Sequence, residues 1–230
     1  SRSNPTEGNP NPSRRWFEWA AGSADGFVRY YDKEQGQRVP VSLPFTFLLL
    51  DELATVKGWH DPSESGIYAN EVRETRQDAL IVRAFKGGEL ASGFYAAIRD
   101  RIKAMGGHFQ ASCYIAFRLD GELVIGNIAF KGAALNAWVE FKKANRSEIY
   151  KQAIMIDGFE DGKKGSTHFR VPTFALKACS EETQTAALAL DQELQAYLKS
   201  YLAARKDDAA ETSADAVAAV YGRSQGDVDD

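Results

Sequence analysis

The chain has 230 residues and a net charge of −4 at pH 7, with 44% hydrophobic and 26% charged residues. That composition is typical of a folded globular protein and excludes wholesale disorder. Two cysteines cannot form a disulfide-rich scaffold. No apolar run approaches the roughly 20 residues that a membrane helix needs. We therefore expect a protein of a reduced, cytoplasmic compartment that does not enter a membrane.

Charge divides unevenly along the chain. Residues 207–230 hold seven acidic residues and one arginine, a charge of −6, whereas the remainder holds 27 basic and 25 acidic residues, a charge of +2. The first 13 residues are rich in Asn, Pro and Ser. We therefore expect a disordered N-terminal arm at residues 1–13, a folded domain at residues 14–206 and a flexible acidic tail at residues 207–230.

β-Strand signals dominate the first part of the folded domain, where aromatic and β-branched residues form short runs separated by glycine and proline. Alternation of apolar and polar residues returns in the second half, where the Asp120-Gly121 pair predicts a hairpin turn. Cys113 falls on the apolar side of its strand and is predicted to be a core residue. The predicted strands cover residues 27–31, 39–50, 67–72, 79–85, 113–119, 123–130, 153–159 and 167–174.

Three helices are predicted among these strands. Apolar residues recur every four positions from Leu90 to Ile102, and a glycine pair then ends the helix. A shorter helix follows Gly132 and places Trp138 in the core. The last helix begins after Ser180, a good N-cap, packs on the body, and gives way to disorder after Lys206.

Motifs of common catalytic and metal sites are missing from the sequence. There is no Gly-x-Ser-x-Gly elbow, residues 162–166 lack phosphate-loop spacing, and the three histidines are widely separated. We therefore predict no catalytic residues, no metal site and no cofactor. A nuclease would still need acidic ligands for Mg²⁺. The acidic candidates are Asp51, Glu52, Glu71, Glu74, Asp78, Asp157 and Asp161.

Aromatic residues are interleaved with arginine and lysine, and this pattern indicates binding of single-stranded nucleic acid. Bases stack on rings for about 1–3 kcal/mol each, while cations follow the phosphates. The alternative is that the rings are core and the cations form a solvated face. The rings expected to stack are Trp16, Trp19, Tyr30, Tyr31, Trp59, Tyr68 and Phe85. The cations expected to contact phosphates are Arg29, Arg73, Arg76, Arg83, Lys86 and Lys131.

Four segments resemble the OB-fold single-stranded DNA-binding proteins of tailed bacteriophages, a likeness that spans residues 11–201. They are residues 59–73, Phe85-Lys86-Gly87-Gly88, Gly106-Gly107-His108-Phe109 and Phe130-Lys131-Gly132-Ala133.

The resemblance implies a five-stranded OB barrel with added helices. Together with the predicted elements, this gives a mainly β, α+β fold: an OB barrel elaborated by helices and extra strands, with a long C-terminal helix. The resemblance also implies sequence-independent DNA binding in phage replication, recombination or repair, in the host cytoplasm and without catalysis. An acidic tail that screens the DNA site and recruits replication or recombination proteins belongs to the same expectation. Asp229-Asp230 departs from the family, because many members end in an aromatic or Pro-Phe tip that docks partners.

Two other functions stay open at this point. One is an Mg²⁺-dependent nuclease that uses the acidic candidates. The other is a protein-interaction or virion-assembly module whose aromatic residues pack against other subunits.

Overall fold

The computed structural model describes residues 10–221, with side chains through Ala204. Its elements follow in chain order: β1 (Trp16–Ala20), β2 (Phe27–Asp32), β3 (Gln37–Val41), β4 (Phe45–His60), η1 (Asp61–Ser63), β5 (Ser65–Ala69), β6 (Leu80–Ala84), β7 (Gly88–Gly93), α1 (Tyr95–Ala104), β8 (Gly107–Leu119), β9 (Glu122–Lys131), α2 (Gly132–Ala144), β10 (Ala153–Lys164), β11 (Thr167–Lys177) and α3 (Glu181–Tyr221).

The described chain forms two compact units, which are treated separately. The first, called the body below, is residues 12–195. The second holds residues 10–11 and α3 from Ala196 onward. Within the second unit, Asn11 Nδ2 donates a hydrogen bond to Tyr197 Oη at 3.3 Å.

The last helix is longer than predicted. We expected helix to end near Lys206, but α3 continues to Tyr221. The added stretch is rich in alanine and lacks proline and glycine, so its helix propensity is high even though its composition is polar. Residues 1–9 and 222–230, which belong to the predicted arm and tail, lie outside the described residues.

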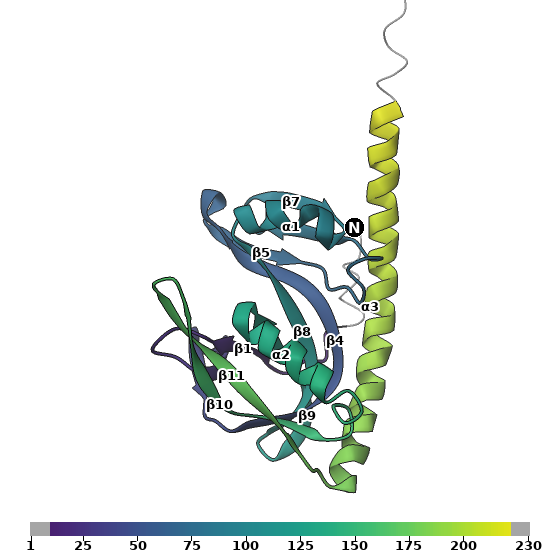
Figure 1. Cartoon of the computed structure of the whole chain (residues 1–230). Coiled ribbons are helices and arrows are strands. Elements are labelled where there is room, and N and C mark those ends of the chain that lie inside the picture. The colour runs from purple at the N-terminus through teal and green to yellow at the C-terminus, as the bar shows by residue number, and fades with distance from the viewer. Residues whose placement is uncertain (1–9, 222–230) are drawn as a thin grey trace, which may run out of the picture. The chain divides into compact units, whose positions relative to one another are not determined.

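The body is mainly β, with helices added to one large mixed sheet, as predicted at this level. The strand order is β3-β2-β1-β9-β8-β4-β5-β6-β7, and β10 leaves this path by pairing with β4 and β11. The β1–β9 pair is parallel, and the other pairs among the described strands are antiparallel. The path is open among these strands, so the sheet is not closed into a barrel. Figure 1 shows β4 and β8 as the long curved strands that run through the body.

One half of the body encloses an aromatic core. Trp138 of α2 is fully buried and lies 5.2 Å, centroid to centroid, from the stacked ring of Phe130. Cys113 is also fully buried, so the core positions predicted for both residues are confirmed. Strand alternation explains why Cys113 belongs to the aromatic core, because every second residue of β8 points toward it. The largest members of the aromatic core are Phe17, Phe45, Phe47, Phe117, Phe130 and Trp138.

The other half encloses a smaller aliphatic core, built from Val56 at the end of β4, from β5 to β7, and from α1. The prediction for α1 began too early. Leu90 is buried on β7, and the helix begins only at Tyr95. Gly93 adopts a φ of 139°, which strongly favours glycine and separates strand from helix. Leu90 fits the four-residue spacing of Ile98 and Ile102 because all three are buried in the same core, not because they belong to one helix.

A third cluster joins α3 to the sheet within the body. Ala187 of α3 is buried with Leu48 of β4 and Ala116 of β8, so the part of α3 that belongs to the body packs on the sheet. Ser180 Oγ accepts a hydrogen bond from the Thr183 backbone N–H, the N-cap contact predicted from sequence.

Candidate nucleic-acid interface

The sheet has one face that α1 leaves uncovered. Directly paired residues on neighbouring strands project to the same face of a sheet. Lys57 of β4 pairs with Tyr68 of β5 and with His108 of β8, and Tyr68 pairs in turn with Arg83 of β6. Ile67 lies on the opposite face, in the aliphatic core beneath α1. The row His108–Lys57–Tyr68–Arg83 therefore lies on what we call the open face.

Three exposed aromatic rings gather at the end of this row. Trp59, Tyr68 and Phe85, named here the aromatic platform, have exposed fractions of 56%, 37% and 74%. Tyr68 and Phe85 stack with their centroids 4.6 Å apart. Trp59 pairs with Gly66, and a Cβ on Gly66 would lie 3.3 Å from the Phe85 ring. Glycine at this position lets Phe85 approach the strand, and the rings form an exposed apolar patch of the kind that marks a binding site.

Cations surround the aromatic platform. Lys57 and Lys86 are exposed, and no carboxylate of the described chain comes within ion-pair distance of either ammonium group. Arg83 approaches Glu89 at 3.8 Å, but both side chains are more than 40% exposed, so this pair is weak. Lys57, Lys86 and Arg83 thus lie near the platform, together with the exposed acids Asp61 and Glu64 of the β4–β5 connection.

A second set of exposed rings lies on β1 and β2. Trp16 and Tyr31 have exposed fractions of 45% and 58%. Two residues after Trp16 on β1, Glu18 accepts hydrogen bonds from Arg29 at 2.8 Å and Arg38 at 3.1 Å. Burial acts to raise the pKa of Glu18, but the hydrogen bond and charge of Arg29, together with the charges of Arg38 and Lys131, lower it below its usual value. The Glu18 carboxylate thus holds two guanidinium groups at the surface, and the cluster of these three side chains has a net charge of +1.

Lys131 lies between the exposed rings of β1 and β2 and the row that leads to the aromatic platform. It lies two residues after Ala129 on β9, and Ala129 pairs with Glu18. Lys131 pairs with Gln110, two residues after His108 on β8, so it lies on the same face as the row that leads to the platform. Partial burial and the charge of Lys131 lower the pKa of His108. The basic strip, as we call it, crosses the sheet and consists of Arg38, Arg29, Lys131, Lys57 and Arg83.

Several predicted binding residues lie elsewhere. Trp19 is 4% exposed and donates from Nε1 to the Arg170 carbonyl at 2.9 Å, so its assignment to a stacking surface is wrong: the ring belongs to the core. Tyr30 packs edge-on against Phe17 at 5.9 Å, on the core side of β2. Arg76 is exposed, but it lies in the loop between β5 and β6 rather than on a strand of the open face.

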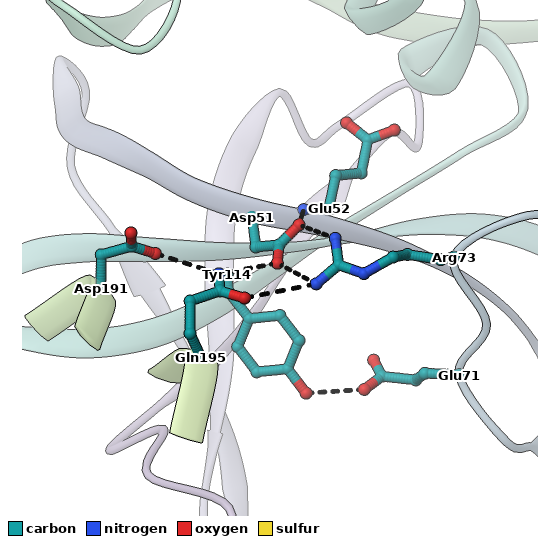
Figure 2. A network of polar contacts seen from close by, with 7 residues as sticks. All are labelled: Asp51, Glu52, Glu71, Arg73, Tyr114, Asp191 and Gln195. Carbon is teal, nitrogen blue, oxygen red and sulfur yellow. Dashed lines mark hydrogen bonds and ion pairs between the residues drawn. The ribbon is translucent and has the colours of Figure 1, made fainter. Parts of the chain in front are cut away.

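Arg73 does not belong to the basic strip, because its guanidinium group forms an ion pair with Asp51 (Figure 2). Its two terminal nitrogens donate to the two carboxylate oxygens of Asp51 at 2.9 and 2.7 Å. The hydrogen bond that Arg73 donates to Asp51 raises the pKa of Arg73, and Gln195 of α3 donates to the same carboxylate at 2.9 Å. Such bidentate pairs fix geometry strongly. Arg73 therefore anchors the β5–β6 loop to β4.

Two of the acidic Mg²⁺ candidates, Glu52 and Glu71, are held by other side chains of the protein. Glu52 accepts from Lys142 Nζ at 2.6 Å and from Trp138 Nε1 at 2.8 Å. Glu71 accepts from Tyr114 Oη at 2.6 Å (Figure 2). It also accepts from Ser112 Oγ. Within residues 10–221, no three His, Cys, Asp or Glu side chains gather as a metal site. These carboxylates tie the loop, the sheet and α2 together.

Sequence reasoning missed Lys57, His108, Arg38 and Glu18. The local signal for Lys57 was short, because only Thr55-Val56-Lys57 alternates between polar and apolar residues within β4. Glu18 and Arg38 are 20 residues apart and meet only through strand pairing. Their partnership had no local signal.

Comparison with models of protein families, with curated proteins and with solved structures gives no match to this chain. Among the described residues, none of the helices combines the length and the apolar character that crossing a membrane requires.

Proposed function

We propose that this protein binds single-stranded DNA without sequence preference and does so without catalysis. The observation that carries the proposal is the joint placement of the aromatic platform and the basic strip on one face of the sheet. Bases stack on flat exposed rings, and phosphates follow a row of cations, so such a face suits an unpaired strand. Sequence independence follows because every base offers a flat face, and the strip reads only charge.

The chain order of the strands supports an OB-type barrel. In this proposal, β4, β8, β9, β10 and β11 are the five barrel strands, and β4 pairs with both β8 and β10. β9 and β11 do not pair with each other among the described residues, which leaves a gap in the barrel. β1 pairs with β9 at this gap, and just after β1 an isolated bridge joins Gly22 to Phe169 of β11. The Arg170 backbone N–H also donates to the Ala21 carbonyl at 2.9 Å. OB folds are partly open barrels, and a gap of this kind is compatible with one.

This assignment places the candidate interface where OB folds bind oligonucleotides. They use the face of the second and third strands with the loops that follow the first and fourth strands. Here those strands are β8 and β9, which carry His108 and Lys131. The aliphatic lobe, with Tyr68 and Phe85, is inserted after β4, the first barrel strand. We infer a role in phage replication, recombination or repair, with partner proteins engaged through the acidic tail.

The nuclease alternative has less support. A metal-dependent nuclease needs carboxylates that can hold Mg²⁺. Asp51 and Glu52 are occupied by Arg73 and Lys142, while Asp157 accepts a hydrogen bond from Thr173 at 2.6 Å. Incubating labelled single strands with Mg²⁺ or Mn²⁺ separates the two functions, since we expect intact strands.

The test of the function is a fluorescence titration with poly(dT) at two salt concentrations. Trp16 and Trp59 are exposed, whereas Trp19 and Trp138 are buried, so stacking should quench only part of the emission. Trp59→Phe keeps a ring and should retain affinity while losing much of the quenching. Duplex DNA should compete poorly. No binding at low salt would contradict the proposal and favour the protein-interaction module.

Salt dependence should report the basic strip. For single strands, the logarithm of the binding constant falls with the logarithm of salt concentration by about 0.7 per neutralised phosphate. We expect Lys131→Ala to reduce this slope by about 0.7 and to weaken binding similarly for all sequences. Lys143→Ala is the matched control, because Lys143 pairs with Glu140 on α2. Equal effects of the two variants would contradict the placement of the strip.

Removing the acidic tail should tighten DNA binding or leave it unchanged. Deletion of residues 207–230 removes a charge of −6, which otherwise competes with DNA phosphates for the cations of the strip. Any gain should be largest at low salt, because screening weakens the competition. A variant with the tail acids changed to Asn and Gln controls for the loss of chain. Loss of binding on truncation would overturn this model of the tail.

A further inference from the structure

A cavity of about 780 Å³ opens into the body beside the start of β4, away from the basic strip. Its deepest wall belongs to the aromatic core: Phe17, Phe45 and Phe117 are at most 7% exposed. Tyr30, which the sequence suggested for base stacking, also lines this cavity. Most protein sites for small ligands have volumes of about 300–1,000 Å³ and mainly apolar walls with a few polar groups.

The charged groups around the cavity all have one sign. Arg15, Arg118 and Lys177 line it, and among the described residues no Asp or Glu does. Arg118 and Lys177 are exposed, whereas the phenylalanine wall is buried, so these charges lie nearer to solvent than the apolar floor. The Arg15 guanidinium lies 4.1 Å from the Tyr30 ring centroid. Within the described chain, no carboxylate forms an ion pair with any of the three cations. An anionic group at the mouth would be attracted by all of them.

The strand edge beside the cavity disfavours an extended peptide as the occupant. β3 pairs with β2 alone among the described strands, and Val39 and Val41 line the cavity. Between them, Pro40 has no backbone N–H to donate to an added strand. Proline on an edge strand is one of the devices that block strand addition. A ligand without a peptide backbone therefore fits this site better.

We propose that the cavity binds an amphipathic organic anion, with an alkyl or aryl body on the phenylalanine wall and one anionic head at the three cations. A medium-chain carboxylate is the simplest member of this class. Burial of the apolar body supplies most of the affinity, and the cations select the sign of the head group. The proposal is independent of DNA binding, because no residue of the strip or the platform lines the cavity.

The free thiols provide a site-specific readout. Cys179 lines the cavity and is partly exposed. Cys113 is fully buried, and burial raises the pKa of its thiol, so it should not react in the native protein. Maleimide modification of the full chain should therefore occur at Cys179. We expect decanoate, below its micelle-forming concentration, to slow this modification and to bind with one-to-one stoichiometry in calorimetry.

Head-group charge and local variants make the test decisive. Decyltrimethylammonium has the same chain with the opposite charge and should bind at least tenfold more weakly, a difference of about 1.4 kcal/mol. Arg118→Ala and Lys177→Ala should each weaken decanoate binding about two- to fivefold. Ser42→Trp places a large ring at the exposed wall without changing a core residue and should abolish protection of Cys179. Lys143→Ala should change nothing.

Three outcomes would overturn the proposal. The first is no binding of decanoate, and the second is equal binding of the cationic amphiphile. The third is stronger protection of Cys179 by a short acidic peptide than by decanoate, which would assign the cavity to a protein partner.

Discussion

Replacing Phe85 with alanine should weaken poly(dT) binding roughly 5- to 150-fold, since each lost base–ring stack costs about 1–3 kcal/mol. Phe85 is the most exposed ring of the platform, with 74% of its surface open, and it stacks on Tyr68 at 4.6 Å. The loss should be similar for poly(dT) and poly(dC), because stacking tolerates any base. A fluorescence or anisotropy titration at fixed salt measures the effect.

The matched control is Tyr150→Ala. Tyr150 has a similar exposed fraction, 59%, but lies after α2 rather than on the open face. It should leave the affinity within about twofold, since isolated surface substitutions are near neutral. Phe85→Ala should also keep its thermal stability, which separates a lost contact from a lost fold. Equal losses for the two variants would show that exposed rings in general, and not the platform, determine binding.

Trp138→Ala should lower the free energy of unfolding by about 3–5 kcal/mol, the range for removing a large aromatic side chain from a packed core. The ring is fully buried and lies 5.4 Å from Phe174 and 6.4 Å from Phe47. Its Nε1 also donates to Glu52, so the variant leaves a carboxylate with one donor fewer. Urea unfolding followed by circular dichroism measures the change.

Trp16→Ala is the comparison for this second prediction. Trp16 is 45% exposed, so its loss should change stability by less than about 0.5 kcal/mol while weakening DNA binding. Trp138→Ala should show the reverse: a less stable protein with nearly unchanged affinity under native conditions. A stability loss below about 1 kcal/mol for Trp138→Ala would contradict the packing of the aromatic core.

The two cores explain how the interface is held. β4 and β8 pair with each other through both halves. Trp59 of the platform lies on β4, and Lys131 lies on β9, which pairs with β8. The Asp51–Arg73 and Glu71–Tyr114 contacts fix the loop that precedes β6 (Figure 2). Rings and cations are thus positioned by rigid elements, which lowers the entropy lost when a strand binds.

The sequence by itself determined the mainly β character, the helix that carries Trp138, the core position of Cys113 and the general chemistry of rings beside cations. These follow from local periodicity, because alternation or a four-residue spacing shows which residues share a face. Of the candidate interface, it identified Trp59, Tyr68, Phe85, Arg83 and Lys131, and the structure places them on the open face or in the strip.

Only the tertiary structure decided which rings are exposed and which cations are free. Trp19 and Tyr31 are both aromatic residues close to charged residues in the sequence, yet Trp19 is buried in the core and Tyr31 is exposed. Arg73 is taken up by Asp51, 22 residues away, and Glu18 gathers Arg38 across two strands. Tryptophan, tyrosine and arginine have both apolar and polar parts, so either face of a strand accepts them. Which face such a residue occupies depends on strands that pair with it from distant parts of the sequence, and the local sequence pattern does not indicate these partners.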